Sequence, residues 1–203
     1  MNHLAHIVLA GPEAGFRLGA FLGDHIRGRQ VLDDMPPDWA AGVVLHRRID
    51  SLSDAHPVLR ELLAKLKPPW RRYGGVIFDV LFDHMLTRHW RSFGCGRLDE
   101  LAGEIDELLA RHADALPDRL VLFSRWARER GLWVRYGDRA MIDEIFRRLA
   151  RRHGRPGPLA DGIKILDAMD AEIEKAFLQI FPDLIEQAGE ERQCLIQSMR
   201  SSM

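Results

Sequence analysis

The stretch Phe78-Asp-Val-Leu-Phe-Asp-His-Met-Leu-Thr-Arg-His-Trp90 decides the fold class, because its apolar residues recur every three or four positions. That spacing places them on one face of an α-helix, whereas a half-buried strand would alternate apolar and polar residues. The same period continues through most of the chain, and no internal repeat interrupts it. The sequence therefore predicts an all-α protein, folded as a compact multi-helix bundle.

Glycine and proline favour turns over helix, so they mark the breaks between the predicted helices. The breaks are expected at Gly28, Pro36-Pro37, Pro57, Pro68-Pro69, Gly94 to Gly96, Pro117 and Gly154 to Pro158. The predicted helices cover residues 12–28, 37–54, 56–67, 69–93, 98–115, 118–130, 137–153 and 159–180, with a last helix after Pro182. At 203 residues and 46% hydrophobic content, the chain is expected to form a single domain over residues 1–203.

Composition excludes several classes of protein. The 29 basic and 30 acidic residues leave a net charge of −1, so we expect no nucleic-acid partner. No apolar stretch is long enough to span a bilayer, and the opening residues lack the basic leader of a signal peptide. Cys95 and Cys194 lie too far apart for a cysteine zinc motif, and a disulfide framework is not expected. A cytoplasmic protein with no membrane partner is the expectation.

Charge is segmented along the chain although the total is near zero. Residues 60–97 carry 8 basic against 3 acidic side chains, and residues 119–153 carry 10 against 4. Residues 98–118 and 154–191 are acidic instead, with 1 against 7 and 3 against 9. The pattern is typical of solvated helix faces that compensate one another, and it also fits a basic surface that docks an acidic partner.

The run His46-Arg-Arg-Ile-Asp50, followed by Ser-Leu-Ser-Asp54, concentrates ionisable residues in one predicted helix. Residues four apart share a helix face, about 6 Å apart along the axis, so His46, Asp50 and Asp54 would form one polar column. An imidazole and a carboxylate one turn apart can share a metal ion, or the carboxylate can orient the imidazole. The alternative is a surface ion pair with the neighbouring arginines, and the spacing leaves both open.

Two further groups place ionisable residues in apolar helices. Asp83 and His84 lie among apolar residues, and buried ionisable groups need partners or a metal ion. A histidine bonded to a backbone carbonyl, with Asp83 at a helix rim, is the alternative. Asp24 lies at the end of an apolar helix that Gly28 closes, where a carboxylate opposes the helix dipole. A role for Asp24 as a ligand would explain a carboxylate at this position. The positive charge of the nearby Arg27 would also be enough to explain it.

Motifs that are missing narrow the chemistry further. The sequence has no Gly-x-Gly-x-x-Gly, no Walker Gly-Lys-Ser/Thr and no Gly-x-Ser-x-Gly. Dinucleotide binding, P-loop chemistry and a hydrolase nucleophile elbow are therefore unsupported. Two distant cysteines also exclude an iron–sulfur cluster bound within the chain. The remaining oxygen and imidazole ligands favour Mn²⁺, Mg²⁺ or Fe²⁺, with Zn²⁺ possible.

Six short segments of the sequence, taken in order, resemble the acyl carrier protein phosphodiesterase family, also called acyl carrier protein hydrolase. The matching strings are residues 2–6, 22–28, 42–50, 53–57, 83–90 and 133–136. The match covers most of the chain and weakens after about residue 150. Two positions depart from the pattern, since relatives often have Phe at the position of His3 and Asn at that of Ala20.

The resemblance implies an all-helical cytosolic enzyme, similar to the HD superfamily of metal-dependent phosphohydrolases. Such enzymes hydrolyse the phosphodiester that joins 4′-phosphopantetheine to a serine of acyl carrier protein, usually with manganese. By resemblance, the metal-site candidates are His6, Asp24, His46, Asp50, Asp83 and His84, and all of these except His6 are also catalytic candidates. The candidates for binding phosphate are Arg27, Arg47, Arg48 and His89.

The sequence thus predicts a metal-dependent phosphodiesterase acting on holo-acyl carrier protein, with Mn²⁺ expected and Mg²⁺ or Fe²⁺ possible. Carrier proteins are acidic, so the basic segments 60–97 and 119–153 would dock the substrate. One alternative is an HD-like phosphohydrolase acting on a nucleotide or a small phosphoester. The other is a metal-free helical binding module whose histidines and aspartates form salt bridges.

Overall fold

The computed structural model describes residues 1–28, 30–152 and 157–201, and none of these residues lies in a strand. The predicted all-α class is confirmed. The α-helices are α1 (His3–Leu9), α2 (Ala14–Leu22), α3 (Pro37–Ala55), α4 (Pro57–Lys65), α5 (Gly74–Arg88), α6 (Trp90–Phe93), α7 (Leu98–Arg111), α8 (Asp118–Arg130), α9 (Leu132–Arg135), α10 (Arg139–Arg152) and α11 (Ile163–Ser201). The 3₁₀ helices are η1 (Gly23–His25), η2 (Gln30–Leu32), η3 (Trp70–Tyr73), η4 (Ala113–Ala115) and η5 (Pro158–Asp161).

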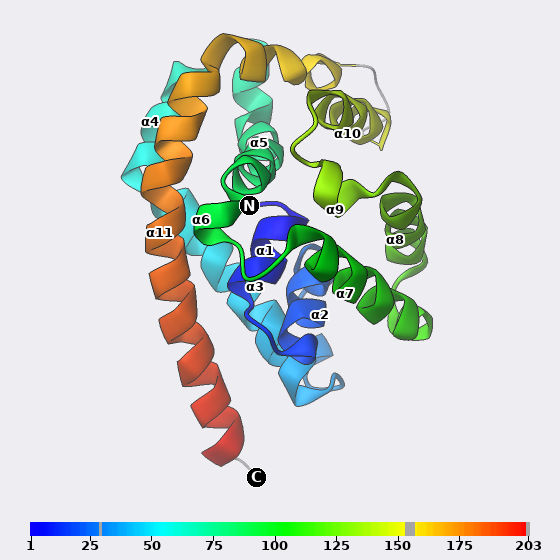
Figure 1. Ribbon diagram of the computed structural model, residues 1–203. Coiled ribbons are helices and arrows are strands. Elements are labelled where there is room, and N and C mark those ends of the chain that lie inside the picture. Colours follow the sequence, from blue (N-terminus) through cyan, green and yellow to red (C-terminus); the bar gives the residue numbers. More distant parts are fainter. Residues whose placement is uncertain (29, 153–156, 202–203) are drawn as a thin grey trace.

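The helices surround a short central helix, α1. In Figure 1, α11 runs along one side of the molecule and α7 to α10 lie on the other, with α1 and α5 between them. The long helix α11 packs against α3, α4 and α5, while α1 packs against α2, α5 and α11. This arrangement brings the first residues of the chain into the middle of the fold.

Two glycines allow α2 and α3 to pack in close contact. A methyl group at Gly19 would lie 2.1 Å from the carbonyl oxygen of Trp39, and one at Gly42 would lie 2.4 Å from that of Phe16. No side chain fits at such distances, so both positions require glycine for this packing. The close approach sets the end of α2 beside the middle of α3, which is where the functional residues lie.

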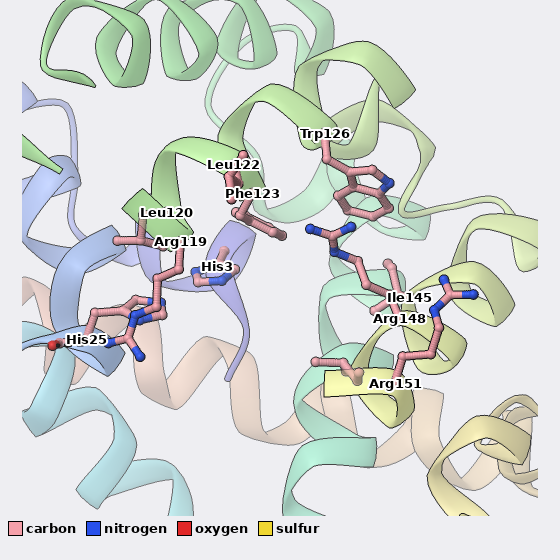
Figure 2. A pocket seen from close by; sticks show the side chains of 11 residues that line it. His3, His25, Arg119, Leu120, Leu122, Phe123, Trp126, Ile145, Arg148 and Arg151 are labelled. Carbon is pink, nitrogen blue, oxygen red and sulfur yellow. Dashed lines mark hydrogen bonds between the residues drawn. The ribbon is translucent and has the colours of Figure 1, made fainter. Parts of the chain in front are cut away.

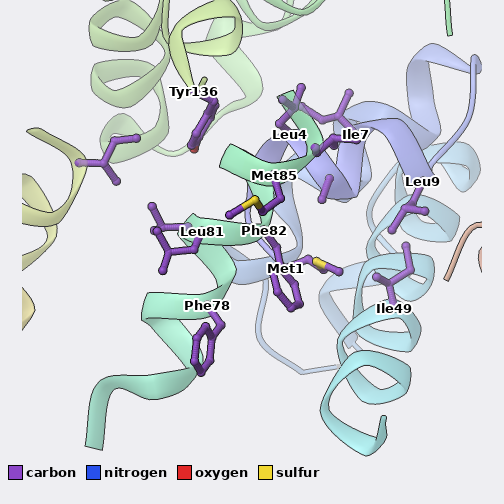
Figure 3. Close-up of a cluster of buried hydrophobic side chains, with 14 of the residues drawn as sticks. Met1, Leu4, Ile7, Leu9, Ile49, Phe78, Leu81, Phe82, Met85 and Tyr136 are labelled. Carbon is purple, nitrogen blue, oxygen red and sulfur yellow. The ribbon is translucent and has the colours of Figure 1, made fainter. Parts of the chain in front are cut away.

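Buried side chains from α1 and α5 form much of the core, as Figure 3 shows for Leu4, Ile7, Phe78 and Phe82. The first backbone N–H groups of a helix have no partner within the helix and must find one elsewhere. In α1 the side chain of Asn2 accepts from the N–H of the next residue at 2.9 Å. The next two N–H groups donate to a carboxylate of α5, which fixes the start of α1 against the core.

Several predicted helices are shorter or divided in the structure. The predicted helix over 12–28 is α2 followed by η1, and the one over 69–93 is divided into η3, α5 and α6. Helices α1 and α9 were not predicted from the sequence, because helices of seven and four residues are too short to show a helical period. The predicted break at 154–158 lies mostly outside the described residues, as does residue 153.

The predicted break at Pro182 was wrong, because α11 continues through it. A proline inside a helix removes one hydrogen bond and costs about 3 kcal/mol. Here Phe177, Ile180, Phe181 and Leu184 are almost completely buried around it. Burial of an apolar side chain of this size stabilises by about 1.5–3 kcal/mol, so the packing offsets the cost of the proline. Among the described residues, no helix is both long enough and apolar enough to cross a membrane.

Candidate metal centre

His46 and Asp50 lie one turn apart on α3, and their side chains meet. His46 Nε2 is 3.2 Å from an oxygen of Asp50. On the other side of the ring, His46 Nδ1 is 2.8 Å from the carbonyl oxygen of Ala20, which can only accept a hydrogen bond. Nδ1 therefore carries a proton, and in the neutral ring Nε2 is left to face the carboxylate or a metal ion.

Asp24 and His6 complete the group from two other segments. Asp24, in η1, places a carboxylate oxygen 3.4 Å from His46 Nε2. His6, in α1, places its Nε2 atom 3.0 Å from the second oxygen of Asp50. We call His6, Asp24, His46 and Asp50 the His–Asp cluster.

Gly23 allows η1 to approach α3 closely enough for this contact. A methyl group at position 23 would lie 2.1 Å from Cγ of His46, far inside van der Waals contact. Any larger residue would therefore displace the ring or the turn. Glycine at position 23 thus allows the close packing that brings the carboxylate of Asp24 to His46.

The His–Asp cluster has the donor atoms of a metal site. The ligand atoms of His6, His46 and Asp50 all lie within 4.8 Å of one another. The Nε2 atoms of both histidines are buried, and within the described part of the chain neither makes a well-directed hydrogen bond. Buried nitrogens without such a bond are costly unless a cation or proton satisfies them. Imidazole and carboxylate together are ligands that divalent transition metals accept, so these residues fit such an ion.

Charge is unevenly distributed within the cluster. Burial opposes protonation of His46, but the close carboxylates of Asp24 and Asp50 outweigh it and raise its pKa to about 9. The contact with His46 lowers the pKa of Asp24 below its usual range. Burial would raise the pKa of Asp50, but its contacts with both histidines lower it overall. Burial lowers the pKa of His6 to about 4. In the metal-free protein, His46 is thus a cation between two carboxylates at neutral pH.

The cluster opens into a cavity of about 610 Å³, which we call the metal cavity. Asp24, Asp50 and Asp54 line it, so the two carboxylates of the polar column expected on α3 face this space, whereas His46 is buried behind them. The side chains of Asp24 and Asp50 are 55% and 39% exposed, whereas those of His6 and His46 are almost completely buried. A ligand can therefore reach the cluster from the side of the carboxylates, in a space of the size usual for small-molecule sites.

Asp83 and His84 have other partners in the structure. Asp83 is completely buried, and its two oxygens accept from the backbone N–H groups of Leu4 and Ala5 at 2.9 and 3.0 Å. Burial raises the pKa of Asp83 to about 7. His84 Nδ1 lies 2.7 Å from the carbonyl oxygen of Tyr136. The structure does not bring these two residues into the His–Asp cluster, and their role as metal ligands stays a prediction.

The four residues predicted to bind phosphate have other contacts or face solvent. Arg47 donates to two carbonyl oxygens of the segment after Asp24, at 2.8 and 3.0 Å, and so supports that segment. Arg27 and Arg48 are exposed. His89 Nε2 lies 2.6 Å from a glutamate of α11. Of the described residues that line the metal cavity, none is one of these four, so their contact with phosphate also stays a prediction.

Three residues that line the metal cavity, His3, His25 and Asp79, were not predicted as site residues. Asp79 lies one turn before Asp83 on α5, and its carboxylate is 2.8 Å from the amino group of Met1. Burial raises the pKa of Asp79. Two carboxylates one turn apart in an apolar helix were a signal that could have identified Asp79. His25 directly follows Asp24, and this position next to a predicted site residue was a second signal.

The fold and the cluster together define a protein whose described residues form helices and no strands, with two buried histidines and two partly exposed aspartates that suit a divalent ion, beside a cavity of small-molecule size. The model of the acyl carrier protein phosphodiesterase family matches residues 1–184. The chain belongs to this family, as its sequence strings had indicated.

The curated relatives match over nearly their whole length. The chain is 33% identical over 190 residues to the acyl carrier protein phosphodiesterases of Escherichia coli O157:H7 and Escherichia coli O6:H1. It is 32% identical to that of Escherichia coli O139:H28. Each comparison covers 93% of this chain and 98% of the relative. No solved structure gives a significant match.

Proposed function

We propose that the protein is a metal-dependent phosphodiesterase that hydrolyses the bond between 4′-phosphopantetheine and a serine of holo-acyl carrier protein. The products are apo-acyl carrier protein and 4′-phosphopantetheine. The observation that carries the proposal is the His–Asp cluster, which opens into a cavity in a member of this family. Mn²⁺ is the proposed ion, in an HD-like arrangement of ligands.

His6, His46 and Asp50 would hold the ion, with Asp24 beside it. When bound, a divalent ion supplies a polarised phosphoryl oxygen and a bound water of lowered pKa. The carbonyl oxygen of Ala20 fixes the ring of His46 so that its Nε2 atom faces the ion. Asp50 contacts both histidines and so holds their relative orientation.

Asp24 has a different role in the proposed reaction, because its side chain is the most exposed of the four side chains in the His–Asp cluster. It accepts a hydrogen bond from the attacking water and orients that water towards phosphorus. In-line attack would then form the bond between the water oxygen and phosphorus and break the bond between phosphorus and the serine oxygen, and the proton lost by the water would end on that serine oxygen.

The carrier would approach over basic residues near the metal cavity. Arg71 and Arg72 are exposed in η3, directly before the first turns of α5, and Gly75 and Val76 of α5 line the cavity. An acidic protein docked there gains electrostatic attraction while its serine-linked arm enters the cavity. The acidity of the partner is part of the proposal.

The test is hydrolysis of purified holo-acyl carrier protein with Mn²⁺, followed by mass spectrometry of the carrier. Loss of the phosphopantetheine mass supports the proposal, and His46→Gln should abolish this loss. Asp114→Asn, which changes an exposed carboxylate after α7, should not. A panel of nucleotides serves as the comparison.

Two results would contradict the proposal. Cleavage of a nucleotide with no cleavage of holo-carrier would assign a different phosphohydrolase activity. Absence of bound metal together with no hydrolysis of any ester would indicate a metal-free binding module.

A further inference from the structure

A second cavity, of about 510 Å³, lies between α8 and α10. Figure 2 shows Trp126 and Arg148 at one end, His25 and Arg119 at the other, and His3 with Phe123 between them. We call it the α8–α10 cavity. Its volume is typical of small-molecule sites.

The α8–α10 cavity adjoins the metal cavity. His3, His25, Ile145 and Leu149 line both of them. The ring of His3 lies against that of Phe123, with centroids 4.9 Å apart. An extended ligand with one end in the metal cavity would pass His3 to reach the second space.

The walls of the α8–α10 cavity combine apolar and cationic groups. Leu122, Phe123 and Trp126 contribute apolar surface from α8, and Leu149 contributes from α10. The guanidinium group of Arg148 lies over the ring of Trp126, 4.5 Å from its centroid. The apolar walls suit the methyl groups of an extended ligand, and arginine N–H groups can donate hydrogen bonds to its amide oxygens.

We propose that the α8–α10 cavity binds the pantetheine arm of the substrate while its phosphate lies at the His–Asp cluster. This inference rests on the proposed function. The arm is an extended chain with two methyl groups on one carbon, two amides and a terminal thiol, attached to an anionic phosphate. A phosphate at the cluster would fix one end of the chain, and the adjoining cavity beyond His3 would hold the other end near Trp126.

The test compares the binding of 4′-phosphopantetheine and of inorganic phosphate to the full-length protein in the presence of Mn²⁺, by titration calorimetry. Both ligands carry a phosphate, so the ratio of their dissociation constants reports the arm alone. We expect the wild-type protein to bind 4′-phosphopantetheine at least tenfold more tightly. Trp126→Ala should reduce this ratio at least fivefold. Trp90→Ala, which removes a half-buried tryptophan of α6, should leave it unchanged.

A second pair of variants decides the question if Trp126→Ala does not fold. Leu122 lines the cavity and is 61% exposed, so Leu122→Asn is compatible with folding, and Leu178→Asn on α11 is its control. Equal affinity of the wild-type protein for both ligands, or equal ratios in a variant and its control, would overturn the inference. The wild-type protein could also bind 4′-phosphopantetheine at least tenfold more tightly than phosphate and yet fail to hydrolyse holo-acyl carrier protein. That result would refute the proposed function but would support binding of the pantetheine arm in the α8–α10 cavity.

Discussion

The imidazole rings of His6 and His46 stack, with centroids 3.8 Å apart and an angle of 18° between their planes. Stacking sets the two Nε2 atoms side by side, and Asp50 reaches both, at 3.0 and 3.2 Å. Two cationic rings would repel each other at this distance. The pair is therefore compatible with one neutral ring and one cation, or with two neutral rings that share a metal ion.

Asp50 is the common partner of both histidines, so its charge should matter most for metal binding. We expect Asp50→Asn to weaken Mn²⁺ binding at least tenfold, measured by titration calorimetry. Asp54→Asn, one turn further along α3, changes a carboxylate that lines the same cavity but lies outside the cluster. Equal losses in the two variants would show that only the overall negative charge of the cavity attracts the ion.

In the metal-free protein, the contribution of His46 to the free energy of unfolding should depend on pH. The pKa of His46 is raised from 6.5 to about 9. The stabilisation is therefore complete below pH 6.5 and is lost as the pH rises through about 9. With screening at the partly exposed carboxylates, we expect His46→Gln to cost about 2 kcal/mol more at pH 6 than at pH 10. Urea denaturation in the presence of a chelator measures this difference, and a pH-independent cost would contradict it.

Gly23 should tolerate no side chain. Gly23→Ala places a methyl group against the ring of His46, so we expect lower metal affinity with little loss of helical circular dichroism. Gly103→Ala is the matched control, since a methyl group there meets only open space on α7. The control should stabilise the protein by about 0.5–1 kcal/mol through helix propensity. Unchanged metal affinity in Gly23→Ala would show that the ring is free to move.

Asp83 offers a way to separate anchoring of α1 from metal binding. Asp83→Ala leaves two buried N–H groups without an acceptor, which costs about 1–3 kcal/mol for each group. We expect the free energy of unfolding to fall by about 3 kcal/mol, measured by urea denaturation. If Asp83 were instead a metal ligand, the variant would lose metal affinity without losing stability in the metal-free state.

The basic residues of η3 should affect association more than chemistry. We expect Arg71→Glu combined with Arg72→Glu to raise the Michaelis constant for holo-carrier at least fivefold, with a smaller change in kcat. Added salt should weaken the wild-type reaction in the same way, because the Debye length is about 8 Å at physiological ionic strength. A small phosphodiester without the carrier is the control substrate. A flat salt response would place docking on another face.

The sequence predicted those parts of the site that lie within one helix. The four-residue spacing of His46 and Asp50 required only helical geometry, and the structure shows their contact. The contacts of Asp24 and His6 with them depend on how three segments pack, through close approaches such as that at Gly19 and Gly42. Periodicity within a segment contains no information about such packing, so His6 was identified only through the family resemblance.

Buried polar residues were harder to assign from the sequence. Asp83 stood out because it interrupts an apolar helix, and that signal was correct in requiring a partner. The partner that the structure shows is the backbone of α1, a helix too short to be predicted. The same difficulty applied at Pro182, where a local rule for helix breaks was overridden by apolar burial on both sides.

The contact between α1 and Asp83 also determines when α1 can be anchored during synthesis of the chain. The backbone groups of Leu4 and Ala5 find their acceptor 79 and 78 residues later in the chain. A ribosome that adds about 5–20 residues per second takes roughly 4–16 s to supply it. Until then α1 lacks this anchor for His6, so we expect a nascent chain to complete the proposed metal site only after α5 has emerged.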